Sequence, residues 1–89
     1  MELKVIKDED NVLEFKIIGE RHSYPGLLKK ALLSLKEVNF VSYKLRHPLD
    51  KDSILIVRTK DGTPKKALQK AVDIIESDLK EFEKQLKKI

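Results

Sequence analysis

Apolar and polar residues alternate in two stretches near the start of the chain, Leu3 to Lys7 and Leu13 to Ile17. A period of two residues is typical of a β-strand with one buried face. The residues between them, Asp8 to Asn11, are all polar and suit a tight turn. The pattern therefore predicts a β-hairpin that buries one face.

The next segment changes to a helical period. Ser23, Tyr24 and Pro25 place a capping hydroxyl just before a proline suited to a first helical turn, and the helix is expected to run to about Lys36. Its apolar residues share one face: Tyr24, Leu27, Leu28, Ala31, Leu32 and Leu35. Leu33 lies among lysines on the opposite side, so it is either a stray exposed leucine or part of a contact with another molecule.

Two further strands and a second helix complete the pattern. Strands are expected at Val38 to Leu45 and at Ser53 to Thr59, and Thr63-Pro64 begins a helix that meets no breaker before Ile89. The second of these strands has four consecutive aliphatic residues, so we expect it to be central and Ile56→Ala to cost about 2–5 kcal/mol of stability.

This β-β-α-β-β-α order predicts an α+β fold. It comprises a four-stranded antiparallel sheet with two helices on one face, in a single domain over residues 1–89.

The last helix carries a regular heptad pattern. Its apolar residues are spaced alternately four and three apart: Leu68, Val72, Ile75, Leu79, Phe82, Leu86 and Ile89. We call these seven residues the seam. A helix of about 26 residues spans about 39 Å, whereas strands of six or seven residues reach about 20–23 Å. The sheet can therefore cover Leu68, Val72 and Ile75, while the last four seam residues overhang and call for a partner.

Composition narrows the possible functions. Lys and Arg total 19 against 15 Asp and Glu, cysteine is absent, and acids and bases are interspersed along the chain. We expect a cytoplasmic protein without disulfides, a membrane segment or a basic tail.

No catalytic, cofactor or metal site is predicted. The three glycines are far apart, so no phosphate-binding loop is present. His22 and His47 lack the further ligands that zinc needs, and Asp8 to Asp10 suit a solvated turn better than a cation site. A small-molecule substrate is not expected either.

A small nucleic-acid-binding domain remains an alternative. Lys29, Lys30 and Lys36 share one helix, and Tyr24 and Tyr43 could stack bases. Exposed lysines are also what solubility requires, and both tyrosines fall in apolar patterns that point inward. Sequence-specific binding of nucleic acid is therefore not expected.

Residues 19–29, 43–49 and 63–68 form three motifs. Together they resemble motifs of archaeal RNA polymerase subunit L and its eukaryotic small α-like relatives. Residues 19–29, Gly-Glu-Arg-His-Ser-Tyr-Pro-Gly-Leu-Leu-Lys, are similar to the family's G-E-D-H-T-L-G-N-L-L-R. Residues 43–49 are similar to Y-x-x-x-H-P-L, and residues 63–68 to T-P-x-x-A-L. The motifs occur in the family's order and with matching spacing over essentially the whole chain.

The resemblance implies a role in assembly. Subunit L pairs through its helices with the larger α-like subunit, which is called D, much as two bacterial α amino-terminal domains pair. The pair is a platform for the large catalytic subunits in transcription. The expected interface contains Tyr24, Leu27, Leu28, Leu33, Ile75, Leu79, Phe82, Leu86 and Ile89.

A self-pairing homodimeric scaffold is a second alternative, because the seam also permits a second copy as its partner. We expect the lysines near Phe82 to repel each other in such a dimer: Lys80, Lys84, Lys87 and Lys88.

Overall fold

The computed structural model describes residues 2–19, 23–44 and 52–89. Its elements are β1 (Glu2–Asp8), β2 (Val12–Ile18), α1 (Ser23–Leu33), β3 (Val38–Lys44), β4 (Ser53–Thr59) and α2 (Pro64–Lys87). The predicted order and the α+β class are confirmed. Helix α1 ends three residues earlier than the pattern suggested, and Leu45 lies outside the described residues.

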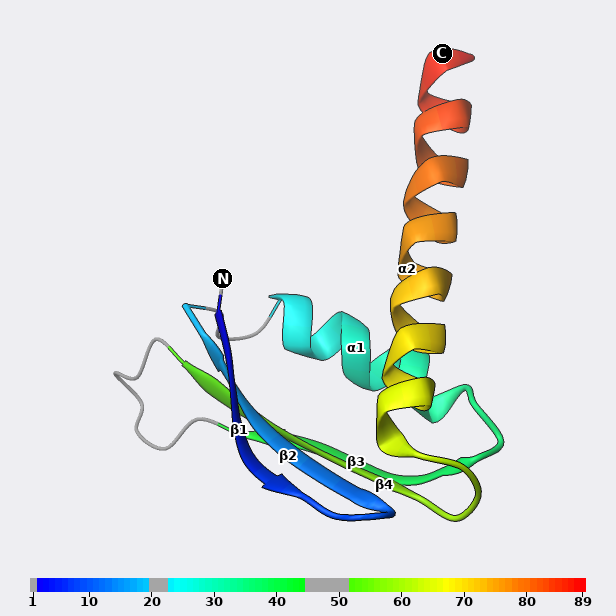
Figure 1. The fold of residues 1–89 in the computed structure, drawn as a ribbon. Helices are drawn as coiled ribbons and strands as arrows, with labels where there is room; N and C mark the ends of the chain where they lie inside the picture. The colour runs from blue at the N-terminus through cyan, green and yellow to red at the C-terminus, as the bar shows by residue number, and fades with distance from the viewer. Residues whose placement is uncertain (1, 20–22, 45–51) are drawn as a thin grey trace.

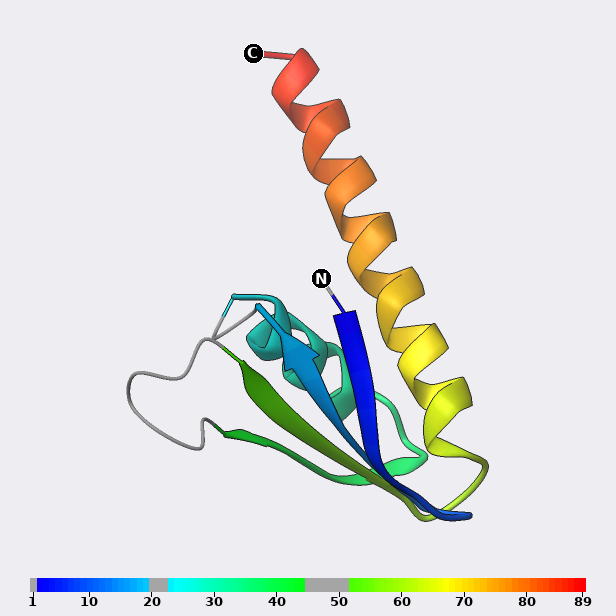
Figure 2. The ribbon, with the colours of Figure 1, turned by 60° about the vertical axis from the view of Figure 1, so that its left-hand side comes forward.

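The four strands form one antiparallel sheet in the order β1-β2-β4-β3, and both helices lie on the same side of it (Figures 1 and 2). The predicted turn between β1 and β2 is present, since the amide of Glu9 donates to the carbonyl of Val12 at 2.8 Å. Strand β4 is central, as expected from its aliphatic run.

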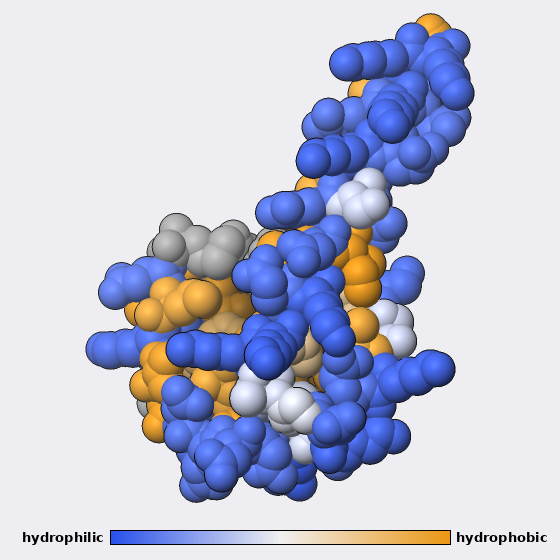
Figure 3. All heavy atoms as spheres, turned by 45° about the vertical axis from the view of Figure 1, so that its right-hand side comes forward, coloured by the Kyte–Doolittle hydropathy of each residue, from blue (hydrophilic) through white to orange (hydrophobic). Residues whose placement is uncertain are grey.

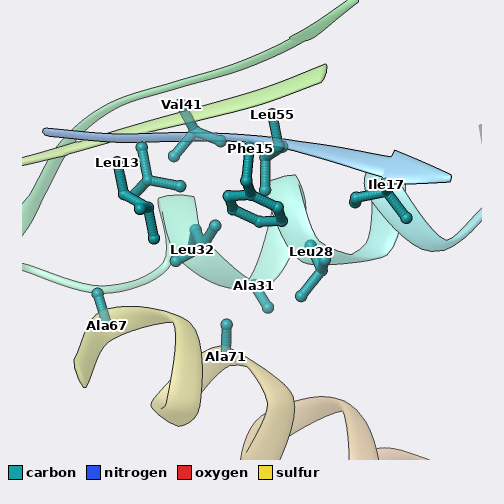
Figure 4. Packing of buried hydrophobic residues seen from close by; sticks show 11 residues of the cluster. Leu13, Phe15, Ile17, Leu28, Ala31, Leu32, Val41, Leu55, Ala67 and Ala71 are labelled. Atoms are coloured by element: carbon teal, nitrogen blue, oxygen red, sulfur yellow. The ribbon is translucent and has the colours of Figure 1, made fainter. Parts of the chain in front are cut away.

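The core lies between the sheet and the helices. Leu13, Phe15 and Ile17 point from β2 toward Leu28 and Leu32 of α1 (Figure 4). Leu55 and Val57 add to it from β4 and are fully buried. Strand β1 differs from the prediction, because all its residues are exposed. It is an edge strand, and the helices pack over the other three strands, with α1 beside β3 and α2 beside β2 and β4.

Ile56 is less deeply buried than expected, because it lies on the face of the sheet that is turned away from the helices. Ile54 lies between Lys16 and Lys44 on the neighbouring strands, whose long aliphatic stems can cover it, and it is buried. Ile56 lies between the shorter Glu14 and Ser42 and is only half-buried. The fully buried residues of this run are its two neighbours Leu55 and Val57, on the helix side.

Helix α2 begins as predicted and is fixed at its base. The Thr63 hydroxyl accepts a hydrogen bond from the Lys66 amide at 3.3 Å, and Pro64 stands in the first turn. Lys70 pairs with Glu37, in the connection between α1 and β3. The hydrogen bond from Lys70 lowers the pKa of the Glu37 carboxyl below its usual value. The cap fixes the start of α2, and the ion pair links its first half to the segment that follows α1.

We expect Leu55→Ala to lower the free energy of unfolding by about 2–5 kcal/mol, as for other fully buried leucines. Ile56→Ala is the matched control, and it should cost less because part of its side chain is already in water. Urea denaturation of both variants measures the difference. Equal losses would mean that the two faces of β4 are equally well covered.

Candidate partner interface

Helix α2 extends well beyond the sheet. Its 24 residues span about 36 Å, whereas each strand has seven residues and spans about 23 Å. The radius of gyration is 14.1 Å, compared with about 12 Å for a compact chain of this length. Figures 1 and 2 show the second half of the helix standing clear of the rest of the molecule.

The projecting half, residues 76–89, is exposed at every position. It includes four large apolar side chains, of which Phe82 is 65% exposed: Leu79, Phe82, Leu86 and Ile89. Hydrophilic residues cover most of this arm in the space-filling view, and hydrophobic residues show at its margin and tip (Figure 3). Burying four such side chains on a partner is worth about 1.5–3 kcal/mol each. The overhang inferred from the heptad spacing is therefore present.

Two alanines, rather than the seam residues, are the fully buried side chains of α2 that face the core. Ala67 and Ala71 are buried, and Ala71 points toward Ala31 of α1 (Figure 4). Their small side chains let the two helices approach closely. The first seam residues, Leu68, Val72 and Ile75, are only half-buried and pack at the margin of the core.

An open groove continues the seam toward β1. Its apolar lining comes from four elements: Leu3, Phe15, Ile17, Leu28, Leu68 and Val72. Lys65 and Gln69 of α2 also line it. Leu3 is 60% exposed although it lies on the helix side of the sheet, opposite Ile17. Leu3 is absent from the expected interface, and the alternation within β1 is the signal that could have found it.

The expected interface residues of α1 lie in different environments. Leu27 is about half exposed and lies one turn from Ala31, on the side of α1 that meets α2. Leu28 belongs to the core and reaches the surface only in the lining of the groove. Leu33 is exposed at the end of α1, on the side away from the core.

The remaining sequence predictions fall partly outside the described residues. His22, His47 and the side chain of Tyr24 lie outside the described part of the structure. Tyr43 packs against the core, which confirms its inward orientation. Within the described ranges, no group of three histidines, cysteines or acids could hold a metal ion. No helix there is long and apolar enough to cross a membrane.

Comparison with known proteins gives the class of this chain. Residues 12–85 match the model of the RNA polymerase Rpb3/Rpb11 dimerisation domain. The chain therefore belongs to this family, as a small, non-catalytic subunit of DNA-directed RNA polymerase.

Within the family, the chain is similar to the archaeal subunit called Rpo11 or L. It is 42% identical to Rpo11 of Sulfurisphaera tokodaii and 44% identical to Rpo11 of Sulfolobus acidocaldarius, in each case over the whole of this chain and at least 97% of the relative. It superposes on the crystal structure of subunit L from Thermoplasma acidophilum with a TM-score of 0.87 and 25% identity. That match covers 98% of this chain and 86% of the other. The predicted membership of the subunit L family is confirmed.

We expect Leu79→Asp and Phe82→Asp to change the free energy of unfolding of the isolated chain by less than about 1 kcal/mol, because both residues are exposed and only helix propensity is altered. Ala71→Asp is the matched control, since it places a charge in the core between α1 and α2. Circular-dichroism melts compare the three variants. Unfolding of the Phe82 variant would show that the arm is part of the chain's own core.

Proposed function

We propose that this chain is the assembly subunit that pairs with the larger α-like polymerase subunit and so forms the platform for the large catalytic subunits. All of residues 1–89 act as a single dimerisation domain. The observation that carries the proposal is the arm of α2, whose apolar seam has no cover within the described residues. Family membership makes another polymerase subunit the natural partner.

The proposed contact surface is continuous. It begins in the groove beside Leu3 and follows the seam through Ile75 to the arm. Leu27 of α1 lies at the edge of this surface. Leu33 is also exposed but lies apart from it. We infer that the groove and the arm bind one partner together, in the manner expected for two bacterial α amino-terminal domains.

No step of nucleotide addition is assigned to this chain, and no cofactor, metal or small molecule is needed for its role. It acts in transcription, in the cytoplasm, by holding other subunits in place. Binding of nucleic acid belongs to other parts of the enzyme in this proposal, since Tyr43 is packed inward rather than displayed for stacking.

We expect Phe82→Asp and Leu79→Asp to weaken binding to the larger α-like subunit by at least about thirtyfold, because a hot-spot residue contributes about 2 kcal/mol or more. Ser77→Asp introduces the same residue on the outward side of the arm and should bind as the wild type does. Co-expression with a tagged α-like subunit, followed by titration of the purified chains, gives the affinities.

Retention of Phe82→Asp on the α-like subunit at wild-type affinity would contradict the proposal. Sedimentation of the pure chain provides the second comparison. A tight homodimer that resists displacement by the α-like subunit would favour the self-pairing scaffold, and salt-dependent binding of nucleic acid by the free chain would favour the other alternative.

A further inference from the structure

The residues that border the seam along the arm are acidic. With 3.6 residues per turn, the positions nearest the seam are those that follow Ile75 and Phe82 on one side and those that precede Leu79 and Leu86 on the other. Glu76 and Glu83 follow Ile75 and Phe82, on one side of the seam. Asp78 precedes Leu79 on the other side, where the next border position is Gln85. Both borders of the seam therefore carry negative charge.

The lysines of the arm lie farther from the seam. Lys84 is almost opposite it, and Lys80, Lys87 and Lys88 are turned about 100° or more from its centre. The helical register thus corrects the expectation that these lysines flank Phe82 and face a second copy. They supply the outward, solvent-facing surface of the arm.

The border acids form no ion pair in the described part of the chain, although Lys80 and Lys87 follow Glu76 and Glu83 at the i, i+4 spacing. The ion pairs found there are Lys7–Glu9, Lys16–Asp52 and Lys70–Glu37, and none involves Glu76, Asp78 or Glu83. In paired helices, residues at such border positions contact the partner helix and determine which partner is accepted. Three carboxylates beside an exposed apolar seam thus indicate the charge of the helix that would cover it.

We propose that the arm selects its partner by charge: the occupant is a helix of another polymerase subunit whose apolar seam is bordered by lysine or arginine. This inference rests on the proposed function and names the chemistry of the partner helix. Because both borders are acidic, a second copy of this chain meets like charge in a parallel or an antiparallel pair. The same charge repels a nucleic-acid backbone along the seam.

Reversing the three border charges tests the proposal. The variant Glu76→Lys, Asp78→Lys, Glu83→Lys keeps every seam residue, and lysine is a good helix former. Each exposed ion pair contributes modestly, and repulsion adds to the loss, so binding to the larger α-like subunit should weaken by about tenfold or more. Wild-type affinity should also fall as added salt screens the pairs, and this dependence should disappear or reverse in the variant.

The matched control reverses the same number of charges on the outward surface: Lys80→Glu, Lys84→Glu and Lys87→Glu. It should bind the α-like subunit within about threefold of the wild type, because these side chains do not face the seam. If Leu79→Asp abolishes binding but the border variant keeps wild-type affinity and salt dependence, charge selection is overturned while the proposed function stands.

A second experiment needs only this chain. Wild type and border variant should each sediment as monomers, because their borders repel their own copies, whereas an equal mixture should form a pair in which acidic borders meet basic ones. A mixture that sediments like its components would overturn the proposal. So would a wild-type homodimer that is tight at low salt, and this result is independent of the α-like subunit.

Discussion

The mismatch in length between α2 and the sheet is the constraint from which the interface follows. Strands of seven residues provide cover for only the first half of a 24-residue helix. Any apolar pattern that continues into the second half must therefore be exposed in the isolated chain. The seam continues without a break, so the same helix that completes the core also presents the surface for a partner.

The close approach of α1 and α2 determines which side of α2 remains available. Ala67 and Ala71 occupy the side of the helix that packs on the core, next to Ala31. Larger residues at these positions would push the helix away from α1. Because the alanines take this contact, the larger apolar residues of the seam are turned toward the groove and the open side. The two alanines thus place the contact with α1 on one side of α2 and leave another side for a partner.

The sequence predicted those features that depend on local periodicity. The strands, the helices and the Thr63 cap follow from spacing within one segment, and the overhang of Leu79 to Ile89 follows from the predicted lengths of the helix and the strands. Two features that depend on how segments pack were missed. The exposure of β1 depends on where the helices lie across the sheet, and the burial of Ile54 over Ile56 depends on which side chains the neighbouring strands place beside each.

The candidate site shows the same division. Heptad spacing identified the seam, but it could not show that Leu3 from the first strand and Leu28 from the first helix meet Leu68 in one groove. The heptad spacing is enough to identify the acidic border residues, because the positions of the seam residues determine which positions lie beside them. The lysines that are close to Phe82 in sequence lie on another side of the helix. The helical register is needed to distinguish closeness in sequence from closeness in space.

The arm keeps its helical form because its first half is anchored. Residues 76–89 have no packing partner within the described chain, and an isolated helix of that length is marginal in water because nucleation is costly. The first turn after Thr63 and the contacts of Ala67 and Ala71 provide the helix nucleus. The helix then only has to extend through the arm. A partner then binds a helix that is already largely formed, and less of the interaction free energy is spent on ordering it. Anchoring at one end and exposure at the other are both needed for this subunit to present a preformed surface.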